Sequence, residues 1–142
     1  EAAVAAGCRV ETGGARATDK GEGNFYQPTV LSGATADMAI AREEIFGPVL
    51  PVVKVKDLDE AIAIANESDY GLTSSIFTNN INAALKAARQ LQYGETYINR
   101  EHFEAMQGFH AGRRNSGIGG ADGKHGLMEY VETHVTYIQT HD

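Results

Sequence analysis

Apolar and polar residues between positions 26 and 99 alternate between short β-branched segments and segments with helical spacing. Residues 49–55 have the composition of a strand, and Pro48 and Pro51 predict that this strand begins irregularly. A helix is predicted directly afterwards, because Asp57 followed three residues later by Glu60 matches a capping box. Its apolar face is formed by residues at helical spacing, namely Leu58, Ala61, Ile62 and Ala65.

The same pattern occurs a second time. After a break at residues 70–72, a strand is predicted over residues 74–78, and Asn79 or Asn80 caps the helix that follows. Gly94 is placed to end this helix in a left-handed conformation, and residues 96–99 form the next strand. The apolar face of the helix comprises Ile81, Ala84, Leu85, Ala88 and Leu91. Strands joined through helices by short links predict right-handed crossovers, a parallel sheet and the α/β fold class.

Three segments lie outside this alternation. Residues 5–10 have the pattern of a helix end leading to a short strand. Residues 99–126 are rich in glycine and lack periodicity, and a loop of that length is typically functional or disordered. Near the C-terminus, a short helix around residues 127–130 precedes a predicted strand without a partner nearby in the sequence, which is an exposed edge unless something covers it.

Composition and charge exclude several classes of protein. The 142 residues are 42% hydrophobic and 22% charged, which is typical of a folded domain, and no apolar run reaches the roughly 20 residues that a spanning helix needs. A net charge of −7 argues against a nucleic-acid partner. A single cysteine excludes an internal disulfide, and the N-terminus lacks a targeting signal. We therefore expect a cytoplasmic protein.

Common catalytic and binding motifs are absent. The glycine-rich residues 117–123 have Asp122 where a dinucleotide fingerprint requires glycine. The five histidines do not have zinc-ligand spacing, so no metal site is predicted. Cys8 has no evident base nearby, and a nucleophilic role is not expected for it.

Two motifs in register resemble the aldehyde dehydrogenase superfamily. Residues 43–48, Glu-Glu-Ile-Phe-Gly-Pro, match its Glu-Glu-x-Phe-Gly-Pro motif, and residues 66–72 match Asn-x-x-x-Tyr-Gly-Leu. A carboxylate can accept hydrogen bonds from the vicinal hydroxyls of a ribose. The resemblance implies that Glu44 binds the nicotinamide ribose of NAD and that Phe46 packs against the nicotinamide. The alternative is a solvated glutamate at a helix end followed by a core phenylalanine.

The long loop resembles the segment that lines the substrate tunnel in this family. Phe103 and Phe109 match its two aromatic positions, whereas Glu104 and His110 stand where small residues are common. Residues 97–112 closely resemble the enzymes that oxidise lactaldehyde and glycolaldehyde, which implies that Glu104 and His110 bind a small hydroxyaldehyde. Alternatively, Glu104 forms a surface ion pair with Arg100 or Arg113.

The resemblance also implies what this chain lacks. The family's cysteine nucleophile, which forms a thiohemiacetal with the aldehyde, and its general base lie upstream, so we expect no catalytic residue here and an inactive isolated chain. Residues 1–130 would be the C-terminal part of the catalytic domain. Residues 131–142 would be an oligomerisation strand and tail, which implies a homo-oligomer, dimer or tetramer. The alternative function is a non-catalytic α/β assembly module.

Overall fold

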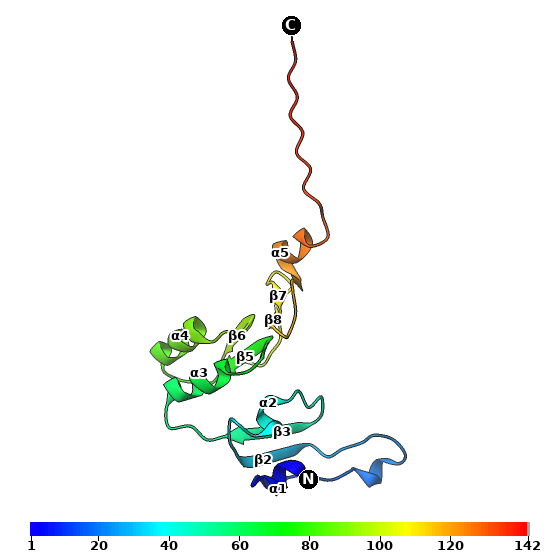
Figure 1. Cartoon of the computed structure of the whole chain (residues 1–142), viewed down its shortest axis with the longest axis vertical. Coiled ribbons are helices and arrows are strands. Elements are labelled where there is room, and N and C mark those ends of the chain that lie inside the picture. The colour runs from blue at the N-terminus through cyan, green and yellow to red at the C-terminus, as the bar shows by residue number, and fades with distance from the viewer. Residues whose placement is uncertain (142) are drawn as a thin grey trace. The chain divides into compact units, whose positions relative to one another are not determined.

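The computed structural model describes residues 1–141 and divides into two compact units, Glu1–Ser68 and Asp69–Asp142 (Figure 1). Each unit contains helices and a pair of parallel strands, which confirms the predicted α/β fold class. The elements of the first unit are the helices α1 (Ala2–Ala5), α2 (Ala39–Arg42) and α3 (Leu58–Asn66), the 3-10 turn η1 (Thr18–Lys20), and the strands β1 (Arg9–Thr12), β2 (Thr29–Ala34) and β3 (Val49–Val53).

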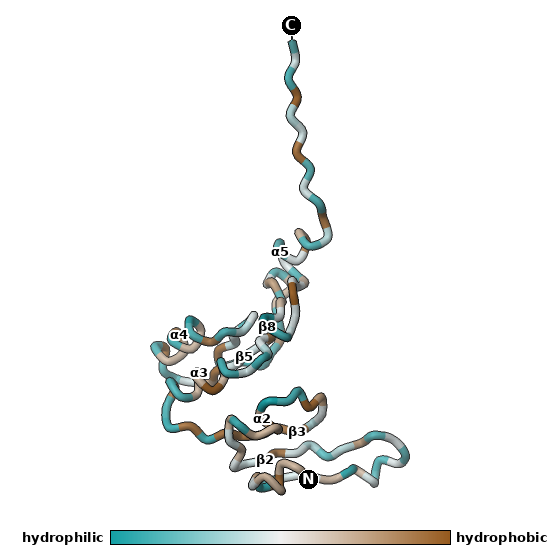
Figure 2. Tube along the Cα trace, viewed as in Figure 1, coloured by the Kyte–Doolittle hydropathy of each residue, from teal (hydrophilic) through white to brown (hydrophobic). Residues whose placement is uncertain are grey.

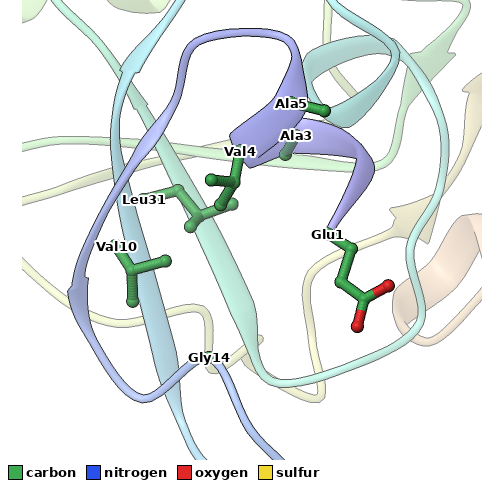
Figure 3. Close-up of a pocket in the computed structure, with 7 residues that line it drawn as sticks. All are labelled: Glu1, Ala3, Val4, Ala5, Val10, Gly14 and Leu31. Carbon is green, nitrogen blue, oxygen red and sulfur yellow. The ribbon is translucent and has the colours of Figure 1, made fainter.

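The first unit is built on a three-stranded sheet in the order β1-β2-β3, in which β2 is antiparallel to β1 and parallel to β3. Cys8, Leu31 and Ala34 form its buried cluster, and Ala3 of α1 and Ile40 of α2 pack against them. An apolar pocket beside this cluster is lined by residues of α1, β1 and β2 together with two neighbours, namely Glu1, Ala3, Val4, Ala5, Val10, Gly14 and Leu31 (Figure 3). The predicted helix end and short strand near Cys8 are thus confirmed as α1 and β1.

The predicted partners of the strand β3 are wrong. The sequence pattern places it in one parallel sheet with the two later strands, but β3 pairs only with β2 among the described residues. Strand β2 was not predicted, because Ser32 and Gly33 interrupt its apolar run. The helix after β3 begins as predicted, since the Asp57 side chain accepts a hydrogen bond from the Glu60 N–H at 2.9 Å.

The second unit contains a parallel pair, β5 (Thr73–Ile76) and β6 (Glu95–Ile98), joined through the helix α4 (Ile81–Gln90). Asn80 caps α4, because its side-chain oxygen accepts hydrogen bonds from two backbone N–H groups of the first turn at 2.9 and 3.2 Å. Of the predicted apolar face, Ala84 is buried, whereas Ile81 and Leu85 are exposed.

Gly94 does not form the predicted left-handed cap. The helix α4 ends at Gln90, the next residue Leu91 is extended, and Gly94 has no positive φ. The glycine is needed for space instead: a Cβ atom here would overlap the carbonyl oxygen of Ala111 and lie 3.1 Å from that of Leu72.

The glycine-rich segment is more regular than predicted. It forms three two-residue strands and the start of a helix, and the predicted break at residues 70–72 supplies a strand that pairs with one of them. These elements are β4 (Tyr70–Gly71), β7 (His110–Ala111), β8 (Arg113–Arg114), β9 (Gly120–Ala121) and α5 (Gly123–Met128). Strand β8 pairs with β4, which joins the segment to residues 70–71, and β7 pairs with β9 within the segment itself.

Residues 131–141 form no helix or strand and run away from α5 as one extended trace (Figure 1). Hydrophobic positions occur among hydrophilic ones along this tail (Figure 2). Tyr137 and Ile138 are almost fully exposed. The predicted terminal strand therefore has no partner within residues 1–141, and Asp142, the last residue of the predicted tail, lies outside the described residues. None of the helices in the described part of the chain has the length and hydropathy needed to cross a membrane.

Candidate functional site

The segment after α2 carries Glu44 and Phe46. The backbone leaves the helix in an extended conformation at Glu43, and Phe46 adopts a left-handed conformation with a φ of 48°. The Phe46 ring is 91% exposed, so the alternative that it is a core residue is wrong. Both residues line an open pocket with neighbours from α2, from β3 and from the segment between them, namely Ile40, Ala41, Glu43, Ile45, Gly47, Val49 and Pro51.

This pocket combines an acidic and an aromatic side chain. An exposed carboxylate offers two acceptor oxygens to a pair of ribose hydroxyls. A largely exposed aromatic ring on a backbone with positive φ is available to contact a ligand or another part of a protein. Glu44 and Phe46 lie two residues apart on one short segment, so both can contact the same ligand.

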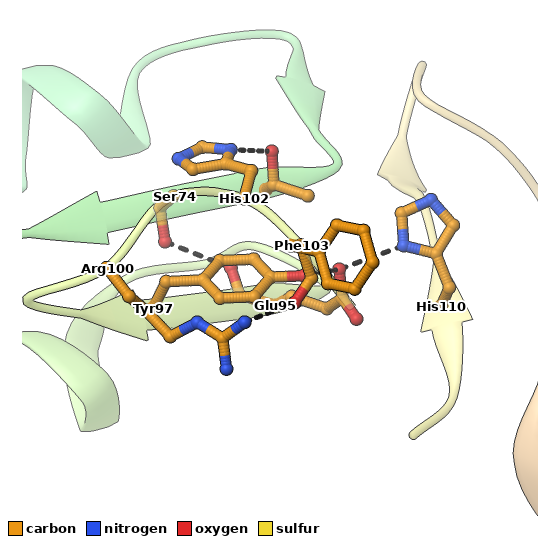
Figure 4. A network of polar contacts seen from close by, with 8 residues as sticks. Ser74, Glu95, Tyr97, Arg100, His102, Phe103 and His110 are labelled. Carbon is orange, nitrogen blue, oxygen red and sulfur yellow. Dashed lines mark hydrogen bonds and ion pairs between the residues drawn. The ribbon is translucent and has the colours of Figure 1, made fainter. Parts of the chain in front are cut away.

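In the second unit, the site is built around a carboxylate that the sequence analysis did not identify. Glu95 is the first residue of β6, and its Oε2 atom lies 2.8 Å from the Tyr97 hydroxyl and 2.9 Å from His110 Nδ1 (Figure 4). The side chains of Glu95 and His110 are only 16% and 29% exposed. An ionised carboxylate only accepts hydrogen bonds, so both the hydroxyl and Nδ1 donate to it.

These contacts raise the pKa values of His110 and Tyr97. The hydrogen bond to Glu95 raises the pKa of His110 above its ordinary value, and partial burial opposes the change. The negative charges of Glu95, Glu104 and Asp122 also raise the pKa of His110. Burial, followed by the hydrogen bond to Glu95, raises the pKa of Tyr97 to about 12. The arrangement therefore shifts the imidazole toward its protonated form and keeps the phenol protonated at neutral pH.

The other predicted substrate residues lie on the segment between β6 and α5. Glu104 is exposed, and its charge raises the pKa values of Tyr97 and His110. Phe103 is 69% exposed, whereas Phe109 is half-buried and packs against His125 with ring centroids 5.6 Å apart.

The alternative surface ion pairs of Glu104 do not form. Within residues 1–141, this carboxylate pairs with neither Arg100 nor Arg113. The Arg100 guanidinium instead donates to the carbonyl oxygen of Phe103 at 2.8 Å and lies over the Tyr97 ring. Glu104 thus contributes a charge near His110 without being neutralised by either arginine.

A signal for Glu95 was present in the sequence. Side chains two residues apart on a strand lie on the same face, so Glu95 and Tyr97 share one face of β6, which begins one residue before the predicted strand. A carboxylate beside a buried tyrosine needs hydrogen-bond donors. The pattern could not name His110 as the second donor, because that contact joins residues 15 positions apart.

Comparison with known proteins identifies the family. The aldehyde dehydrogenase family model matches residues 1–136. The chain belongs to the aldehyde dehydrogenase family. It is 60% identical over 138 residues to lactaldehyde dehydrogenase of Escherichia coli strain K12, and the alignment covers 97% of this chain and 28% of the relative.

Solved structures of family members agree with the fold. A crystal structure of the Escherichia coli lactaldehyde dehydrogenase matches with a TM-score of 0.92 at 60% identity and covers 98% of this chain and 29% of that chain. Betaine aldehyde dehydrogenase of Staphylococcus aureus, solved in complex with NAD+, matches with a TM-score of 0.86 at 39% identity and covers 91% and 26%. The chain therefore spans less than a third of the length of these relatives and corresponds to a partial domain.

Proposed function

We propose that this chain forms the part of an NAD-dependent aldehyde dehydrogenase that binds a small hydroxyaldehyde such as lactaldehyde or glycolaldehyde. The observation that carries the proposal is the His110 imidazole, held by Glu95 at 2.9 Å with the charge of Glu104 nearby. A tunnel for plain aliphatic aldehydes would be less favourable with a histidine and two carboxylates in it, because such a substrate offers no polar group and desolvating these side chains without partners is costly.

A hydroxyl next to the aldehyde carbon supplies a partner for both residues. A hydroxyl donates one hydrogen bond and accepts others, so its oxygen can accept from Nε2–H of a protonated His110 while its proton is donated to Glu104. Phe103 and Phe109 would contact the carbon atoms of the substrate. The 60% identity to lactaldehyde dehydrogenase supports the same substrate class.

Glu44 and Phe46 would hold the nicotinamide ribose and ring of NAD, which supplies the hydride acceptor. Their exposure on a pocket and the NAD+ complex of a 39% identical relative support this assignment. We further propose that the thiol nucleophile and the general base belong to other parts of the enzyme. The isolated chain would then produce no NADH from lactaldehyde, and measurable turnover would contradict this part of the proposal.

A chimeric enzyme tests the substrate assignment. This chain replaces the matching 138 residues of the Escherichia coli relative, and kcat/KM is measured for lactaldehyde and for propionaldehyde, which lacks the hydroxyl. Loss of a hydrogen bond to a charged group should lower the lactaldehyde-to-propionaldehyde ratio about tenfold to a hundredfold in Glu104→Ala and His110→Ala. Glu101→Ala is the matched control and should keep the ratio. Equal losses on both substrates would contradict the assignment.

The tail supports a second role, in assembly. Residues 131–141 are exposed and make no strand within the described chain, although Val135, Tyr137 and Ile138 are apolar. We propose that this segment pairs with another copy in a homo-oligomer, which would cover the exposed side chains. Tyr137→Asp in the chimera should lower the molecular mass measured by light scattering, whereas the unchanged mass of an intact oligomer would contradict this role.

A further inference from the structure

Glu95 lies at the centre of a network of contacts. Its Oε2 atom accepts hydrogen bonds from both the Tyr97 hydroxyl and His110 Nδ1. Two neighbours contact the Tyr97 ring. The His102 ring stacks on it with a centroid distance of 5.2 Å and an interplanar angle of 16°, and the Arg100 guanidinium lies 5.6 Å from the ring centroid. Figure 4 shows these side chains grouped around Glu95.

This network is hydrogen-bonded to residues at the start of the strand β5. His102 Nδ1 lies 2.6 Å from the Thr73 hydroxyl, at the start of β5. The backbone beside Glu95 is also fixed, because its own N–H donates to the carbonyl of Leu72 at 3.1 Å. A carboxylate anchored by its backbone and by two donors has little freedom to turn away from His110.

The contact with Glu95 determines which nitrogen of His110 can bind a ligand. Donation from Nδ1 to a carboxylate leaves Nε2 as the imidazole nitrogen that can contact a ligand, and it fixes the plane of the ring. Three carboxylates raise the pKa of this imidazole: Glu95 on β6, Glu104 on the long loop, and Asp122 before α5. Only Glu95 is hydrogen-bonded to it.

We propose that Glu95 is the positioning residue for hydroxyl recognition: it accepts the proton of Nδ1 and so orients His110, which leaves Nε2 to form the hydrogen bond with the substrate hydroxyl. This inference rests on the proposed function of His110. Glu95 itself does not touch the substrate, and it acts through the imidazole. The selectivity for hydroxyaldehydes thus depends on a residue outside the tunnel loop that carries the contact residues.

The first test uses the full chain and needs no catalysis. NMR titration of the His110 ring in the 142-residue protein should give a pKa above the ordinary histidine value. Glu95→Gln, which keeps the shape but removes the charge, should lower that pKa, and Glu95→Ala should lower it and also remove the preference for a proton on Nδ1. Glu101→Gln is the matched control. A His110 titration that is the same in all variants would overturn the proposal.

The second test measures selectivity in the chimera with the Escherichia coli relative. Glu95→Gln should lower the lactaldehyde-to-propionaldehyde ratio of kcat/KM by about tenfold, chiefly through KM for lactaldehyde. A selective loss in His110→Ala together with an unchanged ratio in Glu95→Gln would overturn this inference and leave the proposed function intact. Unchanged ratios in both variants would overturn the proposed function itself, and the inference with it.

Discussion

Gly94 lies against β7 at the start of β6, where Glu95 and His110 of the proposed substrate site meet, and Gly94→Ala should push the two strands apart. A Cβ atom at this position would overlap the Ala111 carbonyl oxygen, far inside the 3.0 Å that Cβ contacts essentially never cross. Both obstacles are backbone atoms, Ala111 O and Leu72 O, so no side-chain rotation relieves the overlap. The strands must move apart by on the order of 1 Å, and overpacking of this kind costs about 1–3 kcal/mol of the free energy of unfolding.

The same displacement acts on the site, because Gly94 precedes Glu95 and Ala111 follows His110. Moving the two backbones apart lengthens the 2.9 Å contact between the carboxylate and the imidazole, and the pKa of His110 should fall toward its ordinary value. Urea unfolding followed by NMR signals of β5 and β6, with an NMR titration of His110, measures both effects. Gly47→Ala is the control, since the nearest atom to its Cβ lies at 3.9 Å. A stability and a titration that both match the unsubstituted chain would refute the reasoning.

Three further predictions follow from local contacts. Asn80→Ala should lower the free energy of unfolding by about 1 kcal/mol in urea titrations, whereas Asn79→Ala should not, because only Asn80 caps α4. The raised pKa of His110 means that its bound proton stabilises the folded chain fully below about pH 6.5, the ordinary value, and that this contribution disappears as the pH rises through the raised pKa. The stability difference between the chain and Glu95→Gln should therefore shrink with rising pH, and a constant difference would count against the linkage. Cys8 is 4% exposed, so a thiol reagent should label it rapidly only in urea.

Features set by residues close in sequence were predictable. The capping residues Asp57 and Asn80 could be recognised because a cap depends only on the next three positions. Strands β5 and β6 were found for a similar reason, since their composition differs sharply from that of the helix between them. The structure moves only their ends by one or two residues.

Features set by distant contacts were not predictable from one sequence. The partner of β3 depends on β2, whose apolar run is interrupted at Gly33. Gly94 has the spacing of a helix cap, but the position is fixed by the approach of Ala111, which the pattern does not encode. The Glu95–His110 contact depends on the path of the loop between them, so the sequence could suggest that Glu95 needs donors without identifying them.

The two proposed roles are carried by different compact units, and this makes them separable by experiment. Glu44 and Phe46 belong to Glu1–Ser68, whereas every contact described for His110 comes from Asp69–Asp142. Glu44→Gln in the chimera should raise KM for NAD and slow hydride transfer, because an amide binds the ribose hydroxyls less strongly than a carboxylate. The ratio of kcat/KM for lactaldehyde to that for propionaldehyde should not change, since the Glu95–His110 pair is untouched. A loss of selectivity in Glu44→Gln would show that the two roles depend on one another, and an unchanged rate of hydride transfer would count against Glu44 as a cofactor ligand.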